Sequence, residues 1–208
     1  MRRFLFVLLT FLIFVQSSYA KVEQNTFQQS EENQAITTQA NIFYAENDIK
    51  KALELFLSIP EEQRSPQNWL LLGNILQDQG KLDEAIFMYK KAIQVDDKYY
   101  KAYYNLGNIY LQQDKPNMAV TEYKKVTKLN PDYAYGHYNL ACAYIKLGKY
   151  SSAKYELYNA IDLKGTVADF HYNLAYVFKM LNNEKKAKET LEHYNKLMEN
   201  QYVQSDNF

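Results

Sequence analysis

Three asparagines, Asn105, Asn139 and Asn173, recur in this 208-residue sequence at a constant interval of 34 residues. Each side-chain amide offers a hydrogen-bond donor and an acceptor, the same pair of groups that a peptide unit presents. A tyrosine directly precedes each asparagine, and tyrosine supplies flat, rigid contact area with a polar tip. These residue types suit hydrogen bonding to another polypeptide better than they suit covalent chemistry.

The histidines do not form a recognisable catalytic or metal-binding set. His137 and His171 also stand 34 residues apart, in positions that hold Trp69 and Tyr103 elsewhere in the chain. If they lie on successive helices about 10 Å apart, both imidazoles cannot reach one zinc ion at about 2 Å. We expect both to be packed side chains, and we expect His193 to lie on the solvated surface.

The single cysteine, Cys142, leaves two alternatives open. An unpaired thiol in an oxidising compartment can form an intermolecular disulfide. A partly buried, unreactive thiol is the alternative that we favour. The sequence contains no glycine-rich phosphate loop, paired-carboxylate cleft or nucleophile elbow. It therefore predicts a protein that is not an enzyme and that needs no metal or other cofactor.

The composition is that of an ordinary folded protein, with 47% hydrophobic and 23% charged residues. Lysine and arginine number 24, and aspartate and glutamate also number 24. Without a net positive charge, binding to nucleic acid has no electrostatic support.

The 34-residue interval extends to residues that pack. One set of leucines follows it: Leu72, Leu106, Leu140 and Leu174. One set of alanines follows it as well: Ala85, Ala119, Ala153 and Ala187. Two residue types that keep one period across four copies indicate a repeat array.

Each copy has the pattern of two helices. In the copy at 100–133, apolar residues three and four apart form a first set: Tyr103, Leu106 and Tyr110. A second set follows a break at 113–115: Ala119, Tyr123 and Val126. This spacing places each set on one face of a helix. Small residues opposite the alanines, such as Gly73 and Gly107, let the two helices approach closely.

This pattern resembles the tetratricopeptide repeat. The resemblance is carried by Tyr103-x-x-Leu106-Gly107-x-x-Tyr110, then Ala119-x-x-x-Tyr123, then Pro131, and it covers roughly residues 33–201. It implies an all-α fold, a right-handed superhelical solenoid of antiparallel helix pairs. Five repeats are expected, at 33–65, 66–99, 100–133, 134–167 and 168–201, followed by a tail at 202–208.

The resemblance also implies that one face of the first helices lines a concave groove. The predicted groove residues are Asn74, Lys101, Tyr104, Asn105, Asn108, Tyr135, Tyr138, Asn139, Asp169, Tyr172 and Asn173. Helices about 10 Å apart would place an amide beside roughly every third residue of an extended peptide, which rises about 3.3 Å per residue. The groove lacks clustered cations, which argues against recognition of a free peptide C-terminus.

The asparagines have an alternative interpretation, as part of the family's scaffold pattern with no ligand. If they instead bind a peptide, Asn105→Ala with Asn139→Ala should abolish capture of the partner and leave thermal unfolding nearly unchanged.

The N-terminal residues have a different character. Two arginines precede an uncharged run at 4–15, and Ser18-Tyr19-Ala20 places small residues where a signal peptidase cleaves. Residues 1–20 are therefore predicted to be a secretory signal peptide, cleaved after Ala20. An uncleaved anchor that tethers the protein to the membrane is the alternative. Cleavage predicts an exported, periplasmic protein with no integral membrane span.

Two terminal segments border the array. Residues 21–32 are polar and rich in glutamine, and we expect a mobile leader. At the other end, apolar residues form one stripe on the last helix: Ala187, Leu191, Tyr194 and Met198. Residues 201–208 are too few for a helix that would cover this stripe, so we expect it to be exposed or covered by a partner.

These observations together predict a non-catalytic adaptor of the cell envelope whose partner is a protein or an extended peptide. The alternative is an assembly subunit that forms a homo-oligomer, or docks into a larger complex, through the last helix or the convex face.

Overall fold

The computed structural model describes the backbone of residues 2–205 and the side chains of residue 16 and residues 18–200. These residues form ten α-helices and one short 3-10 helix, and no strand occurs among them. The α-helices are α1 (Arg2–Ala45), α2 (Ile49–Ser58), α3 (Pro66–Asp78), α4 (Leu82–Val95), α5 (Tyr100–Gln112), α6 (Pro116–Leu129), α7 (Ala134–Lys146), α8 (Tyr150–Leu163), α9 (Ala168–Met180) and α10 (Glu184–Ser205). The predicted all-α class is confirmed.

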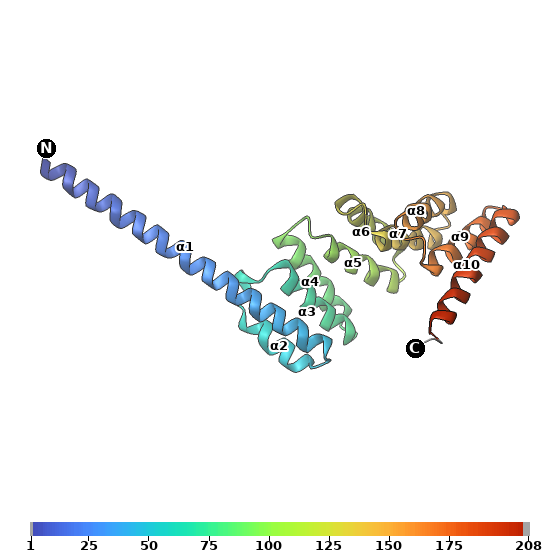
Figure 1. Ribbon diagram of the computed structural model, residues 1–208, viewed down its shortest axis with the longest axis horizontal. Coiled ribbons are helices and arrows are strands. Elements are labelled where there is room, and N and C mark those ends of the chain that lie inside the picture. The colour runs from blue at the N-terminus through green and yellow to red at the C-terminus, as the bar shows by residue number, and fades with distance from the viewer. Residues whose placement is uncertain (1, 206–208) are drawn as a thin grey trace.

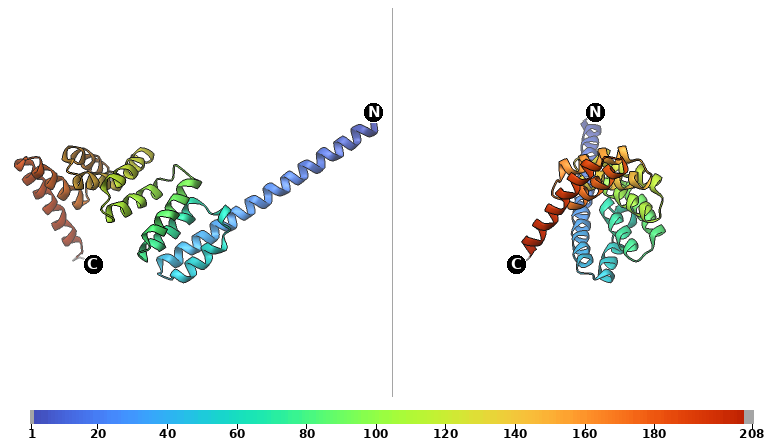
Figure 2. Two further views of the ribbon diagram at one scale, coloured as in Figure 1. Left: turned by 180° about the vertical axis from the view of Figure 1, so that it is seen from behind. Right: turned by 90° about the vertical axis from the view of Figure 1, so that its right-hand side faces the viewer.

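The helices pack in sequential pairs, and the pairs follow one another along the molecule (Figures 1 and 2). The C-terminal part of α1 packs against α2, and α3 packs against α4. The remaining pairs are α5 with α6, α7 with α8 and α9 with α10. Each inner pair also contacts the next one, mainly through its second helix. The predicted solenoid of helix pairs is therefore confirmed.

The turn within each pair contains one residue in the left-handed backbone region. These residues are Asn47 (φ 62°), Gly80 (φ 75°), Asp114 (φ 54°), Gly148 (φ 68°) and Asn182 (φ 55°). Glycine, asparagine and aspartate adopt this conformation at the lowest steric cost. The same break in every pair keeps the 34-residue period, with one interval of 33 residues between the first and second pairs.

Close approach within a pair depends on a small residue in the first helix. A Cβ added at Gly73 would lie 2.4 Å from the ring of Tyr89, and one at Gly107 would lie 2.5 Å from the ring of Tyr123. In the next pair, Ala141 occupies the equivalent position and faces Leu157 in place of a tyrosine. Both of these side chains are fully buried, so the smaller partner makes room for the added methyl group.

Two prolines set the course of the link between α2 and α3. Pro60 precedes the 3-10 helix η1 (Glu61–Gln63), and Pro66 is the first residue of α3. Ser65 and Asn68 form a reciprocal capping box at this helix start, which satisfies otherwise unpaired backbone N–H groups. Trp69 is only 4% exposed, as expected for a residue that anchors the core.

Helix α1 includes residues 21–32, the segment expected to be a mobile leader. This helix was not predicted from the sequence, and the side chains of the segment are exposed. The segment contains no glycine or proline, so nothing in the sequence ends the helix there. The predicted signal peptide falls mostly on residues whose side chains lie outside the described part of the chain. Among the described residues, no helix has the length and apolar character needed to cross a membrane.

Candidate functional site

The predicted groove residues lie on α3, α5, α7 and α9, the first helices of four successive pairs. We call the surface formed by these eleven residues the first-helix face. Lys101, Tyr135, Asp169 and Tyr172 are exposed on it, and the other seven residues are half-buried. None is fully buried, so the sequence placed all eleven at or near the surface.

The asparagines of the first-helix face bind one another across the repeats. The Asn105 amide donates to Asn74 Oδ1 at 2.8 Å. The Asn139 amide donates to Asn108 Oδ1 at 2.9 Å. Each bond joins one first helix to the next, across 31 residues of sequence. These amides therefore link neighbouring pairs.

Tyrosines from the second helices complete this network. The Tyr89 hydroxyl donates to Asn74 Oδ1 at 2.9 Å, and the Tyr123 hydroxyl donates to Asn108 Oδ1 at 2.6 Å. Burial raises the pKa of both hydroxyls above the ordinary tyrosine value, which keeps them protonated as donors. The contacts favour the scaffold interpretation of the asparagines. They also indicate that replacing these amides would destabilise the array, whereas the peptide-binding hypothesis predicts nearly unchanged unfolding.

The pattern changes at Cys142, which occupies the position of Asn74 and Asn108. Here the Asn173 amide donates to the Tyr138 hydroxyl at 3.0 Å and to Cys142 Sγ at 3.4 Å. Burial raises the pKa of Cys142 to about 11. Since the thiolate is the reactive form, the thiol is mostly unreactive at neutral pH, in line with the alternative favoured from the sequence.

Aromatic rings form a continuous chain along this side of α5, α7 and α9. Tyr133 lies 5.3 Å from both Tyr100 and Tyr104, and 6.2 Å from Tyr135. Phe170 continues the chain, at 5.6 Å from Tyr135 and stacked at 4.7 Å on Tyr138. Rings at these separations and tilts attract one another, so the chain holds its exposed members in fixed positions.

Sequence reasoning identified only the tyrosines of the helix face and missed Tyr100, Tyr133 and Phe170. Tyr133 precedes α7, at the same repeat position as Tyr99. Aromatic residues at this position in two successive copies were a signal that the sequence contained.

One row of exposed residues runs along the first helices at a single repeat position, and the residue type there differs from copy to copy. The row consists of Gln67, beside the first-helix face, and of Lys101, Tyr135 and Asp169 within it, all exposed. The Lys164 ammonium lies 5.1 Å from the centre of the Tyr135 ring. A row with one cation, one ring and one carboxylate can distinguish partners by sequence, whereas the amide network beneath it repeats a structural contact.

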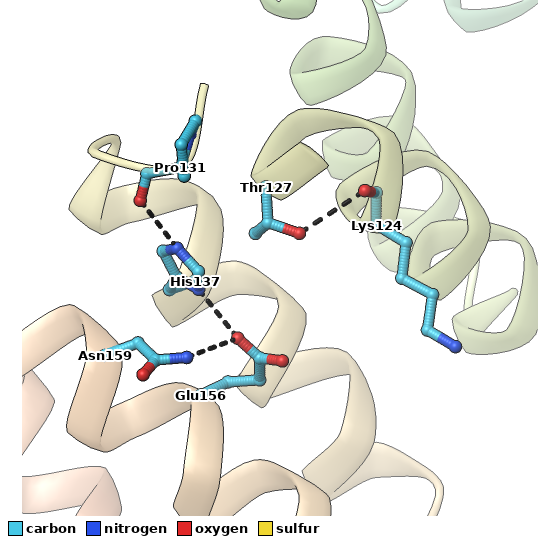
Figure 3. Close-up of polar contacts among 6 residues, drawn as sticks. All are labelled: Lys124, Thr127, Pro131, His137, Glu156 and Asn159. Carbon is cyan, nitrogen blue, oxygen red and sulfur yellow. Dashed lines mark hydrogen bonds and ion pairs between the residues drawn. The ribbon is translucent and has the colours of Figure 1, made fainter. Parts of the chain in front are cut away.

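His137 is more than a packed replacement for an aromatic residue. Figure 3 shows its ring between Glu156 and the backbone of Pro131. Nδ1 lies 2.7 Å from Glu156 Oε2, and Nε2 lies 2.9 Å from the Pro131 carbonyl oxygen. The hydrogen bond to Glu156 raises the pKa of His137. With two acceptors at its two nitrogens, the ring is suited to carry both protons.

The equivalent His171 lacks this carboxylate. Its Nε2 lies 2.8 Å from the Gly165 carbonyl oxygen, but Thr190 replaces Glu156 at the matching position. Burial lowers the pKa of His171, and nearby His193 adds to the effect. The 4.5 Å ring contact between His171 and His193 also shows that His193, although exposed, packs on the array.

A separate pocket lies between α1, η1 and the start of α3. It encloses about 620 Å³ and is lined only by asparagine, glutamine, serine and threonine. Without an aromatic anchor or a charge it offers little for specific affinity, so the first-helix face is the stronger candidate. Within the described part of the chain, no group of three histidine, cysteine, aspartate or glutamate side chains could hold a metal ion.

Comparison with family models agrees with this architecture. Three models match in succession: a TPR repeat at residues 73–114 and two tetratricopeptide repeats at 100–133 and 122–155. A model of anaphase-promoting complex, cyclosome, subunit 3 matches residues 20–92, about a third of the chain. No curated protein sequence matches the chain significantly.

Solved structures of MamA share the fold. A crystal structure of MamA has a TM-score of 0.71 and 19% identity, and the match covers 79% of this chain and 96% of that one. The ArsTM double mutant of MamA RS-1 has a TM-score of 0.72 and 18% identity, and the match covers 83% of this chain and 96% of that one. MamA AMB-1 has a TM-score of 0.67 and 19% identity, and the match covers 81% of this chain and 92% of that one. At these identities the similarity establishes the fold alone.

Proposed function

We propose that this tetratricopeptide-repeat protein is a non-catalytic scaffold that binds a partner protein through its first-helix face. The repeats belong to a type of domain that mediates protein interactions. The observation that carries the proposal is the aromatic chain through Tyr133, Tyr135 and Phe170, with ring contacts of 5.6 and 6.2 Å at Tyr135. Tyrosines held rigidly at a surface lose little conformational entropy on binding and are common interface anchors.

The proposed ligand is an extended segment of the partner. The exposed row offers Lys101, Tyr135 and Asp169 on three successive first helices. An extended peptide that crosses these helices would meet them in turn. Since the amide network is engaged within the array, the ligand's contacts are assigned to this row and to the half-exposed tyrosines beside it.

We place this function in the cell envelope, as the predicted signal peptide at 1–20 supports. Cleavage after Ala20 would release the array into the periplasm. An uncleaved segment would keep it attached to the membrane. N-terminal sequencing of the protein recovered from its native envelope tests this placement, because a mature chain that starts at Met1 would contradict cleavage.

The binding proposal is tested with Tyr135→Ala combined with Asp169→Ala. This double variant should capture at least tenfold less of the partner that the wild type recovers from native envelope extract, as quantified by mass spectrometry. A matched control is Tyr155→Ala with Asp162→Ala, which removes the same two residue types from exposed positions on α8. Equal loss in both variants, or no loss in the first, would contradict the assignment of the face.

A second candidate function is assembly with other copies or with a larger complex. One observation favours it: Tyr172 is 53% exposed, Tyr176 42% and Leu191 41%. Large apolar side chains that gather on one surface often mark a site of protein contact.

A further inference from the structure

The last pair of helices forms a pocket that shares only Tyr172 with the first-helix face. It has a volume of about 570 Å³ and lies between α9 and α10, with Tyr172, Tyr176, Lys179, Glu184, Lys188 and Leu191 in its wall. We call it the terminal pocket. Among residues 2–205, no helix follows α10.

The repeat period identifies what such a pocket accepts. One period earlier, Leu191 corresponds to Leu157, which is 0% exposed, whereas Leu191 is 41% exposed. Tyr172 corresponds to Tyr138, which stacks on Phe170 of the next first helix at 4.7 Å. In the inner pairs, the equivalent surface is therefore covered by the first helix of the following pair. The residues that line the terminal pocket are therefore equivalent to those that contact a following first helix in the inner pairs.

The opposite end of the array presents a first helix with no preceding pair among the described residues. On α1, the residues Ala35, Thr38 and Ile42 correspond to the face by which inner first helices contact the pair before them. We call these three residues the outer face of α1. Ile42 is 45% exposed, but its counterparts Ile75 and Ile109 are 1% and 0% exposed.

We propose that the outer face of α1 in one copy of this protein occupies the terminal pocket of a second copy, in the register of a further repeat. The inference rests on the proposed assembly role and names its partner. The two surfaces continue the contact that already joins neighbouring pairs within the chain, so one copy supplies what the other lacks.

The lengths of the terminal helices fit this arrangement. Helix α10 has 22 residues, whereas α4, α6 and α8 have 14 each. Helix α1 likewise extends upstream of residue 33, where its repeat begins. Short connections make a first helix run antiparallel to the second helix before it. In a stack of two copies, the upstream part of α1 would therefore lie beside the last turns of α10.

The contact joins two different surfaces, so each added copy leaves one end of each kind free. Such a contact builds open chains, or rings if the rotation closes. Sedimentation velocity of the purified full chain over a concentration series should therefore show species that grow beyond the dimer. A wild type that stays monomeric at all concentrations would overturn the proposal.

Charge placed in either surface should stop growth. Ile42→Lys blocks the outer face of α1, and Leu191→Lys blocks the terminal pocket, with Tyr176→Lys as a second pocket variant in case Leu191→Lys fails to fold. Leu57→Lys is the control, since Leu57 is 62% exposed on α2 outside both surfaces. Each of the three blocking variants should sediment as a monomer, and the control should grow like the wild type.

An equimolar mixture of Ile42→Lys and Leu191→Lys gives the sharpest result. Each variant keeps one intact surface, so the mixture should form two-chain species and nothing larger. Association through the apolar N-terminal run would persist in every variant, and that outcome would overturn the proposal. Partner capture dependent on Tyr135 and Asp169 should be retained in Ile42→Lys, so failure of stacking is distinguishable from failure of the binding function.

Discussion

His137 and His171 occupy the same position in successive repeats, but the structure gives them opposite acid–base behaviour. The Glu156 carboxylate stabilises the protonated form of His137 and raises its pKa, whereas burial disfavours protonation of His171 and lowers its pKa. The hydrogen-bond partners of the two histidines differ because one repeat has Glu156 where the next has Thr190.

The His137–Glu156 pair should make stability depend on pH. Because folding raises the pKa of His137, its contribution is fully present below the ordinary histidine pKa of about 6.5 and is lost as pH rises through the raised value. We expect Glu156→Gln to lower the free energy of unfolding by about 1.5–3 kcal/mol at pH 5.5, a typical range for a charge-assisted hydrogen bond. The deficit should shrink by pH 8.5.

Urea unfolding of the wild type and of Glu156→Gln at the two pH values measures this difference. His171 acts in the opposite direction, since its lowered pKa costs stability as pH falls below about 6.5. That contribution is common to both proteins and cancels in the comparison. Thr190→Ala is the control at the matching position and should show no such pH dependence; an equal deficit at both pH values would refute the charged pair.

At the scale of the helices, the asparagine network predicts that the first-helix face holds the array together. Asn108→Ala removes the acceptor of both Tyr123 and Asn139, and leaving a buried donor unpaired costs about 1–3 kcal/mol. The control, Asn117→Ala, changes an exposed amide on α6 and should cost less than about 0.5 kcal/mol.

Chemical denaturation measures both variants. Tyr123→Phe removes the matching hydroxyl, so its combination with Asn108→Ala should cost less than the sum of the two single changes. Additive costs would mean that the 2.6 Å contact between Tyr123 and Asn108 contributes nothing.

The repeat period was sufficient to predict the helix pairs because the residues that set it are buried inside each pair. Leu106, Ala119 and Tyr123 are 2%, 0% and 0% exposed, and their spacing along each helix is fixed by its geometry. The hydrogen-bond partner of Asn105 could not be predicted in the same way. Helical spacing gives the side of a helix on which an amide lies, but the distance to the neighbouring helix decides whether it binds Asn74 or a ligand.

The continuous helix at 21–32 was missed for a related reason. Its polar composition indicates that nothing can be buried there, which is correct, since its side chains are exposed. Composition does not exclude an exposed helix, however, when the residues favour helix and no breaker is present. Whether this segment is mobile remains a prediction.

At the scale of the molecule, each pair contacts mainly its neighbours, so stability should decrease toward the two ends of the array. Hydrogen–deuterium exchange followed by mass spectrometry should show the slowest amides in α5–α8, which have pairs on both sides. The fastest helical amides should lie at 21–32, because an isolated helix of this length is marginal in water. Protection there equal to that of α5 at low protein concentration would show that the segment is held by contacts within one copy.

Raising the protein concentration connects this gradient to the stacking of copies. If the outer face of α1 enters the terminal pocket of another chain, protection should increase together at 33–45 and in α9 and α10, while α5–α8 stay unchanged. The exposed control Leu57→Lys should follow the wild type, and Ile42→Lys should lose the increase at both ends at once. An increase confined to α1 would indicate a symmetric contact between N-terminal helices, because only a contact between the two different ends couples Ile42 to the pocket around Leu191.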